Sequence, residues 1–417
     1  MQFKRVVVTG LGAITPLGNS VQDYWNNLVS GVSGCAPITR FDASKFKTRF
    51  ACEVKGFNPE DYIDKKEVRR LDLFSMFGLA SSQQAWDDSG LGQTNFDPDD
   101  IGVIWGSGIG GLETFFNESV NFAKGDGTPR FNPFFIPKMI ADICSGHISM
   151  RFNLRGPNFT TVSACASSTN ALIDALNYIR LGKAKVFISG GSEAAVNEPS
   201  VGGFNSMHAL STRNDSPETA SRPFDKDRDG FVLGEGSGAI VLEELDYALA
   251  RGAKIYAELV GGGMSADAHH LTAPHPEGLG ATNVMKSALK DAGLNANEID
   301  YINVHGTSTP LGDIAESKAI LKVFGDHAYN LNISSTKSMT GHLLGAAGSI
   351  EAIASILSVK NDLIPPTINH STDDPDLDNK LNFTFNKAQH KTVRAALSNT
   401  FGFGGHNASV IFKKFVL

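Results

Sequence analysis

The sequence predicts a layered α/β fold made of two related halves. Short apolar runs that end near glycine alternate with segments of helical periodicity. The chain has 43 glycines in 417 residues, and many stand at the ends of these runs, where tight turns favour glycine. A faint repeat relates residues 160–191 to residues 333–405. We therefore expect an N-terminal half over residues 1–250 and a C-terminal half over residues 251–417.

The strand-like and helical segments follow one another in a regular order. Strands are expected at residues 6–8, 101–105, 186–189, 239–242, 301–304 and 410–412. A helix is expected over residues 168–180, where Leu172, Leu176 and Ile179 form one apolar stripe and Gly182 is a stop signal. Two further helices are expected over residues 282–292 and 350–360, ending at Gly293 and Asn361.

Composition and charge exclude several classes of protein. The net charge is −7, from 37 basic and 44 acidic residues, so nucleic acid is not an expected partner. The N-terminus passes directly into a strand-like run, and no apolar run approaches the ~20 residues that span a bilayer. We expect a cytoplasmic protein without membrane contact. The four cysteines lack CxxC spacing, which argues against zinc and against a disulfide scaffold.

One short basic cluster stands out from this acidic background. It consists of Lys65, Lys66, Arg69 and Arg70. Charge pattern alone favours a solvated helix face. The alternative is a docking surface for an acidic protein, which only an identified active site would favour.

Cys165 stands between a β-rich run and a helical pattern. Its sulfur is therefore expected at a helix N-terminus, where the positive end of the dipole favours thiolate. Its neighbours Ala164, Ala166 and Ser167 are small and leave room for a substrate. The alternative is a buried structural thiol, because free cysteine packs as a small apolar residue.

Two histidines occupy turns far from Cys165 in the sequence. His305 ends a strand-like run and precedes Gly-Thr-Ser-Thr-Pro, and His342 follows Gly341 in a turn that begins near Lys337. Either histidine alone can simply satisfy a loop. Together with a cysteine at a helix start they provide the groups of thioester chemistry. No HExxH or CxxC motif supports a metal site.

The glycine-rich segment 401–405 lies between strand-like runs. It lacks the strand-to-helix setting of a nucleotide-binding GxGxxG loop. A backbone N–H that donates to an oxyanion, with Phe403 shielding the pocket, suits it better.

These motifs together resemble one enzyme family. Ser-Ala-Cys165-Ala-Ser, His305-Gly-Thr-Ser-Thr-Pro, Lys337-Ser-Met-Thr-Gly-His342 and Phe-Gly-Phe403-Gly-Gly occur in this order. The chain resembles the β-ketoacyl-acyl-carrier-protein synthases over its whole length, and among them the synthase II group of bacterial fatty-acid elongation. The resemblance implies a thiolase-type fold of five layers, a homodimer, and no required cofactor.

The resemblance also assigns roles to matching residues. Cys165 would be the acylated nucleophile, and His305 and His342 would act on the malonyl group. Lys337 would order this network together with Glu316, and the N–H groups of Cys165 and Phe403 would form the oxyanion hole. The acyl chain would be bound by Ile109, Phe134 and Phe135 near the dimer interface, with Thr307 and Thr309 as further substrate-binding residues; core packing is the alternative for the three apolar residues.

The implied partner is an acidic acyl carrier protein, loaded with acyl or malonyl groups. It would dock on Lys65, Lys66, Arg69 and Arg70, with Arg130 and Lys138 extending the surface. Positions that surround a structural Na⁺ or K⁺ ion in some members match Asn303, Glu351, Ser398 and Asn399.

The chain departs from the family pattern at two positions, and other functions stay open. His406 replaces the more familiar threonine after the glycine pair, and Val304 replaces an alanine, which leaves substrate preference open. A ketosynthase of polyketide or other secondary metabolism is the enzyme alternative. A non-catalytic partner subunit that sets chain length would lack the nucleophile, and Cys165 argues against it.

Overall fold

Two sets of strands with the same internal order form the framework of the fold. The computed structural model describes residues 3–416, and these form one ten-stranded sheet in the order β10-β9-β13-β14-β8-β1-β7-β6-β4-β5. Its strands are β1 Val6–Ile14, β4 Ile101–Gly106, β5 Asn158–Thr161, β6 Val186–Glu193, β7 Gly236–Glu244, β8 Ala257–Ala266, β9 Tyr301–Asn303, β10 Asn332–Ser334, β13 Ala395–Gly402 and β14 His406–Lys413.

Each half of the sheet repeats one topology. In the first half, β4 is parallel to β5 and β6, whereas β7 is antiparallel to β6 and β1. In the second half, β9 is parallel to β10 and β13, whereas β14 is antiparallel to β13 and β8. The halves join where Val7 and Val8 of β1 pair with Glu258 and Ala257 of β8. The boundary at residue 250 itself stays a prediction.

Helices lie between the two halves and on both outer faces. They are α1 Val21–Val29, α2 Lys65–Val68, α3 Leu73–Ser89, α4 Leu112–Lys124, α5 Phe135–Met139, α6 Ile143–Phe152, α7 Ser167–Arg180, α8 Glu198–Ser206, α9 Leu245–Ala250, α10 Leu279–Ala292, α11 Pro310–Phe324, α12 Lys337–Thr340 and α13 Ala347–Asn361. Two short antiparallel strand pairs are formed by β2 Ala36–Pro37 with β3 Phe50–Ala51, and by β11 Leu363–Ile364 with β12 Gln389–His390.

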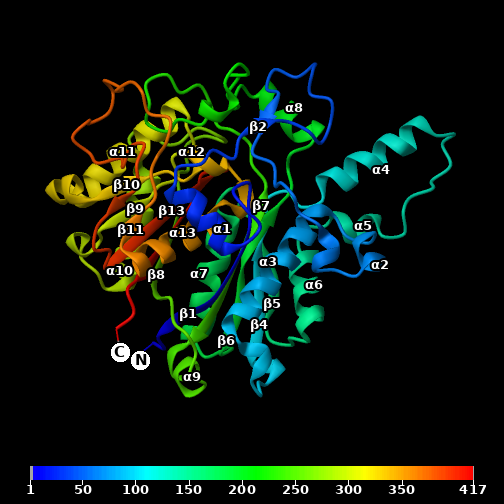
Figure 1. The fold of residues 1–417 in the computed structure, drawn as a ribbon, viewed down its shortest axis with the longest axis horizontal. Coiled ribbons are helices and arrows are strands. Elements are labelled where there is room, and N and C mark those ends of the chain that lie inside the picture. Colours follow the sequence, from blue (N-terminus) through cyan, green and yellow to red (C-terminus); the bar gives the residue numbers. More distant parts are fainter. Residues whose placement is uncertain (1–2, 417) are drawn as a thin grey trace.

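The helices and strands stack in five layers. α7 and α13 contact strands of both halves and each other, whereas α3 and α6 cover the first half and α10 covers the second. Figure 1 shows α7 and α13 in the middle, with α3 and α6 on one side and α10 and α11 on the other. The fold is therefore the thiolase-like α/β arrangement that the sequence predicted.

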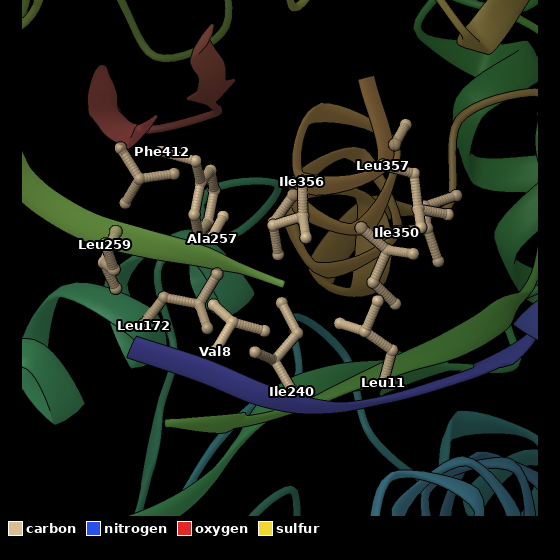
Figure 2. Close-up of a cluster of buried hydrophobic side chains, with 14 of the residues drawn as sticks. Val8, Leu11, Leu172, Ile240, Ala257, Leu259, Ile350, Ile356, Leu357 and Phe412 are labelled. Atoms are coloured by element: carbon tan, nitrogen blue, oxygen red, sulfur yellow. The ribbon is translucent and has the colours of Figure 1, made fainter. Parts of the chain in front are cut away.

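The main core lies around the central helices. In Figure 2, side chains from β1, β7, β8 and β14 converge on α7 and α13: Val8, Leu11, Ile240, Ala257, Leu259, Phe412, Leu172, Ile350, Ile356 and Leu357. Fully burying one such large aliphatic side chain contributes roughly 1.5–3 kcal/mol. Every residue of α13 from Ala347 to Val359 is buried, because the helix has strands of both halves around it and is apolar or small on nearly every side. The exception is Glu351, which is paired with Lys337.

The predicted elements are present, and the differences lie at their ends. β1 continues through Gly10 and Gly12 to Ile14, although glycine had indicated the end of the strand. A Cβ at position 12 would lie 1.9 Å from the carbonyl oxygen of Ser81 in α3. These glycines therefore allow a helix to pack closely on the strand. α13 includes Asn361, and Asp362, with φ of 52°, ends it.

A helical arm projects from one side of the molecule. It comprises residues 112–139, including α4 and α5, and Figure 1 shows it extending beyond the layers. No residue of α4 is buried. Its exposed large apolar side chains are Phe115, Phe122, Phe131, Phe134 and Ile136. Across residues 3–416, no helix has both the length and the apolar character needed to cross a bilayer.

Candidate active site

Cys165 lies in a sharp turn between β5 and α7. Ala164 has a φ of +50°, a left-handed conformation that costs energy for a residue with a Cβ. The hydroxyl of Ser167 donates to the carbonyl of Ala164 at 2.6 Å and accepts from the N–H of Ser163 at 2.9 Å. The first turn of α7 thus holds the bend and presents the sulfur at the start of the helix.

The structure brings the cysteine and both histidines together. His342 Nε2 lies 3.0 Å from Cys165 Sγ. The rings of His305 and His342 are 5.2 Å apart between centroids and nearly perpendicular, at 88°. His305 follows β9, and His342 lies in the turn between α12 and α13. The convergence predicted from three separate motifs is therefore present.

The protonation of Cys165 differs from the sequence prediction. Burial raises the pKa of its thiol to about 12, although the charge of Lys337 and the N–H groups of Phe403 and Cys165 act in the opposite direction. The helix start does not outweigh the loss of solvent. The resting group is a neutral thiol, and its proton must be transferred when the sulfur attacks.

Both imidazoles are neutral in this environment. Burial, followed by the charge of Lys337, lowers the pKa of His305 and of His342 well below the ordinary value of 6.5. The Nδ1 atoms of both rings are buried without a hydrogen-bond partner among the described residues. Each neutral ring has one N–H to donate and one nitrogen to accept a proton.

Lys337 pairs with Glu351 rather than with Glu316. Its ammonium forms a buried ion pair with the Glu351 carboxylate on α13. Glu316 instead accepts hydrogen bonds from the N–H groups of His305 and Gly306, both at 2.9 Å. Burial raises the pKa of each carboxyl to about 7. Glu316 therefore fixes the turn of His305, and Lys337 acts on it only through its charge.

Two backbone N–H groups converge on the sulfur. Those of Cys165 and Phe403 both act to lower the pKa of the Cys165 thiol. A Cβ at Gly402 would lie 2.7 Å from the carbonyl oxygen of Ser163 and 3.1 Å from the nitrogen of Cys165. Only glycine lets the two segments approach this closely. Two such N–H donors would suit an oxyanion hole, and this role for them stays a prediction.

The reactive groups face a cavity of about 590 Å³. Its wall includes Ile109, Thr307, Thr309 and Phe403, as predicted, and the hydroxyls of Thr307 and Thr309 are 3.1 Å apart. Phe204 and Phe231, which the motifs did not indicate, also line it. The cavity is large enough for a small ligand or an acyl group.

Phe134 and Phe135 do not line this cavity within the single chain. Phe134 is exposed and lies under the guanidinium of Arg70, with a cation-to-ring distance of 5.1 Å. Phe135 stacks on Phe115 and Phe131 at centroid distances of 6.3 and 5.5 Å. Both belong to the projecting arm. Their role in the acyl tunnel was expected near a dimer interface, which a single chain does not contain, so it stays a prediction.

Glu193 organises the cavity wall, although no sequence motif indicates it. It ends β6 and accepts hydrogen bonds from the N–H groups of Gly108, Ile109, Gly110 and Gly345 at 2.7–3.1 Å. It joins the Ile109 loop to the loop that precedes α13. The sequence feature that could have indicated Glu193 is a single acidic residue at the end of a strand, next to glycines.

The predicted docking residues form a surface at the base of the arm. Lys65, Lys66, Arg69 and Arg70 are exposed on and just after α2. Lys66, Arg69 and Arg70 share a shallow pocket with residues 132–134, and Lys138 belongs to the neighbouring α5. Arg130 stands apart on the loop after α4, 3.7 Å from Asp126.

The residues predicted to surround a cation divide into two groups. Asn303 and Ser398 are neighbours on β9 and β13. The Asn303 amide, the Ser398 hydroxyl and Glu351 Oε2 are buried without hydrogen-bond partners among residues 3–416. Asn399, in contrast, donates to Glu316 and accepts from Ser409. Oxygen atoms of this kind suit a monovalent cation, and three of the four residues fit.

Comparison with known proteins agrees with this geometry. Residues 3–248 match the family described as "Beta-ketoacyl synthase, N-terminal domain", and residues 256–371 match "Beta-ketoacyl synthase, C-terminal domain". The chain is 52% identical to 3-oxoacyl-[acyl-carrier-protein] synthase 2 of Synechocystis sp., covering 100% of this chain and 99% of that protein.

Solved structures show the same fold. A β-ketoacyl synthase from Burkholderia phymatum superposes with a TM-score of 0.91 at 35% identity, covering 99% of this chain and 100% of that chain. A second solved structure is a type II polyketide ketosynthase in complex with its acyl-carrier protein and bound to a hexaketide. It superposes with a TM-score of 0.90 at 30% identity, covering 100% of this chain and 100% of that chain. The chain belongs to the β-ketoacyl synthase family, the acyltransferase-class condensing enzymes with a thiolase-like fold.

Proposed function

We propose that this protein is a 3-oxoacyl-[acyl-carrier-protein] synthase of type 2, which condenses malonyl carrier protein with a Cys165-bound acyl chain in fatty-acid elongation. The observation that carries the proposal is the 3.0 Å contact between Cys165 Sγ and His342 Nε2, with His305 in the same cavity. Relatives at about 50% identity over the full length have this name. The proposal includes a cytoplasmic location, in keeping with those relatives.

The first half-reaction loads the acyl chain. His342 Nε2 takes the proton of the Cys165 thiol as the sulfur attacks the thioester carbonyl carbon. The N–H groups of Cys165 and Phe403 stabilise the tetrahedral oxyanion. When it collapses, the carrier-protein thiolate leaves and takes up the proton held by His342. The acyl group remains on Cys165 as a thioester.

The second half-reaction forms the carbon–carbon bond. The thioester carbonyl of the malonyl group accepts hydrogen bonds from the neutral rings of His305 and His342, which stabilise an enolate as CO₂ leaves. The enolate carbon attacks the acyl carbonyl carbon, and the same two N–H groups hold the new oxyanion. Cys165 leaves as a thiolate and takes up one proton from solvent, and the 3-oxoacyl carrier protein is released.

Extension assays test the proposal directly. Malonyl-dependent elongation of acyl carrier proteins with several saturated chain lengths is measured with the wild-type protein and with Cys165→Ala as the inactive control. The expected product is one 3-oxoacyl chain, two carbons longer, for each CO₂ released. Absence of elongation with every acyl length would overturn the proposal.

A polyketide ketosynthase is the second candidate, because a structural neighbour at 30% identity is described with a bound hexaketide. The same assay separates the two. A polyketide enzyme would extend its own 3-oxo product repeatedly without intervening reduction, whereas the proposed function predicts that extension stops after one condensation.

We infer that the carrier protein docks on the basic surface at α2. Lys65, Lys66, Arg69 and Arg70 are exposed, and the contact of Arg70 with Phe134 adds an apolar ring to the surface. Exposed charges of this kind act mainly on encounter rate and are screened by salt. A structural neighbour is described in complex with its acyl-carrier protein.

Neutralising all four basic residues to glutamine tests the docking surface. The variant is expected to lose carrier-protein-dependent acylation at least tenfold, with a weaker salt dependence, while a small acyl thioester reacts as in wild type. Lys183→Gln and Lys286→Gln, on other surfaces, are the matched controls. Equal losses with both substrates would contradict docking at this surface.

We also propose a homodimer. β5 is an edge of the sheet, and Val162, just after it, is 61% exposed. The arm exposes Phe115, Phe122 and Phe131, and such clusters mark interaction surfaces. Light scattering at micromolar concentration should give twice the mass of the chain, and Phe115→Ser should lower it. A wild-type monomer would contradict the proposal.

A structural Na⁺ or K⁺ ion near Asn303, Glu351 and Ser398 remains a proposal. Their unpartnered buried oxygen atoms support it. Dialysis into choline chloride should lower the melting temperature, and adding back K⁺ or Na⁺, but not more choline, should restore it. Ser398→Ala should remove this ion specificity. Equal melting temperatures in all three salts would contradict a bound ion.

A further inference from the structure

Two cysteines outside the reaction cavity lie opposite each other on short paired strands. β2 and β3 are antiparallel, with Ala36 opposite Ala51. The same register places Cys35 opposite Cys52, one position beyond the strand ends. Both thiols are free and buried, with Cys35 9% exposed and Cys52 1% exposed.

The hydrogen bonding shows which kind of cross-strand pair this is. The N–H of Ile38 donates to the carbonyl of Arg49 at 3.0 Å, and hydrogen-bonded and non-hydrogen-bonded pairs alternate along an antiparallel ladder. Cys35 and Cys52 therefore form a non-hydrogen-bonded pair, and the Cys52 N–H donates away from it, to the carbonyl of Leu233 at 2.8 Å. The Cα atoms of such pairs are about 4.5 Å apart, which a disulfide can span.

The two sulfur atoms also share one small apolar cluster with Phe50, Ala220 and Val232. Burial, followed by a hydrogen bond with Cys35, raises the pKa of the Cys52 thiol well above its ordinary value. Cys35 is the more exposed of the two. A small oxidant would therefore reach Cys35 first, and Cys52 is positioned to react with its product.

Cys52 contacts the turn that carries His342. Gly341 has a φ of +67°, and a Cβ there would lie 2.9 Å from Cys52 Sγ. The segment 232–235 also links Cys52 to His342. Its backbone is hydrogen-bonded to Cys52 on one side, and on the other side the N–H of His342 donates to the carbonyl of Val232 at 2.7 Å. A disulfide would turn the Cys52 sulfur toward Cys35, and the turn that carries His342 would lose its contact with that sulfur at Gly341.

We propose that Cys35 and Cys52 are a peroxide-sensitive thiol pair whose disulfide disturbs the His342 turn. The Cys35 thiolate attacks one oxygen of hydrogen peroxide, giving a sulfenic acid and a hydroxide that takes up the proton lost by Cys35. The Cys52 sulfur then attacks the sulfur of the sulfenic acid. The displaced hydroxide combines with the Cys52 proton. Two thiols are thus oxidised to one disulfide, and one peroxide is reduced to two waters.

The modification is tested by mass spectrometry on the full-length protein. Cys165 is first protected as its acyl-enzyme, and the protein is treated with a few equivalents of hydrogen peroxide, then catalase. Trypsin without reductant should give a linked peptide of residues 6–40 and 50–55, which dithiothreitol separates. Cys144 is a buried comparison and should stay open to alkylation after denaturation. Peptides in which Cys35 and Cys52 are both alkylated, or oxidised without a link, would overturn the assignment.

A single-turnover assay tests the coupling to His342. After oxidation and catalase, the acyl-enzyme is mixed with malonyl carrier protein. The wild-type rate should fall at least twofold and recover with dithiothreitol, whereas Cys35→Ala, which keeps Cys52 against Gly341, should not respond. Cys35→Ser is the second variant should the first fold poorly. If the enzyme contains the Cys35–Cys52 disulfide and its rate is unchanged, the disulfide does not disturb the His342 turn, and the proposal is overturned. The linked peptide is detected independently of activity, so a failure of the proposed condensation would be a separate result.

Discussion

Replacing Glu316 by glutamine should change how the stability of the protein depends on pH. Glu316 is fully buried, and burial raises the pKa of its carboxyl to about 7 from an ordinary value of 4.5. A carboxyl whose pKa is higher in the folded state contributes stability that is present below pH 4.5 and is lost as the pH rises through 7. Glutamine has the same shape and cannot titrate.

The size of the effect follows from the two pKa values. For one group that titrates at about 7 when folded and at 4.5 when unfolded, the contribution falls by about 2.5 kcal/mol between pH 5 and pH 8. The glutamine also loses one acceptor for the N–H of His305 or Gly306, a nearly pH-independent cost of about 1–3 kcal/mol. The stability of wild type minus that of the variant should therefore fall by about 2.5 kcal/mol over this range and change sign, so that the variant is the more stable protein at pH 8.

Urea unfolding at pH 5, 6, 7 and 8 measures this difference. The other buried carboxyls, including Glu235 and Glu351, are present in both proteins and largely cancel. Thr307→Val, in the same turn but without a titrating proton, is the matched control and should differ from wild type by a constant amount. If the Glu316→Gln curve also runs parallel to wild type, the carboxyl does not titrate as the buried geometry requires.

Three further predictions concern the reaction. Cys165→Ala should form no acyl adduct, and an adduct on the intact protein by mass spectrometry would remove its role as nucleophile. His305→Ala should still acylate but lose roughly 10²–10⁴-fold in decarboxylation, measured as CO₂ release; normal turnover would show that the roles are wrong. Gly402→Ala should displace the Phe403 N–H and slow acylation by roughly 10²-fold, measured by stopped-flow release of the thiol. Gly203→Ala is the control: a Cβ there meets no atom within 4 Å, so acylation should keep its wild-type rate.

The reactive residues could be predicted from sequence because each stands in a local turn with its own signature. Cys165 and His305 follow strands and precede a helix or a glycine, so the strand ends bring them together. His342 follows a glycine in the turn after the short helix α12. The partner of Lys337 could not be found in this way. Glu351 belongs to another helix, and only the packing of α13 selects it over Glu316.

Other features depend on burial or on distant packing. The pKa of Cys165 is set by loss of solvent, which local sequence does not give. Phe134 and Phe135 lie on the arm, outside the wall of the cavity that the single chain forms, and their role at a dimer interface stays a prediction. The opposition of Cys35 and Cys52 requires the register of β2 and β3, two strands of two residues each, which are too short to leave a periodic signal.

The repeated strand order places the chemistry at matching corners of two copies. Cys165 lies between β5 and α7, and His342 lies between β10 and α13 in the second copy, where the short helix α12 is inserted before it. An ancestral duplication would explain this correspondence, with one copy specialising in nucleophilic attack and the other in proton handling. A polypeptide severed between the copies would then regain turnover only when both fragments reassociate.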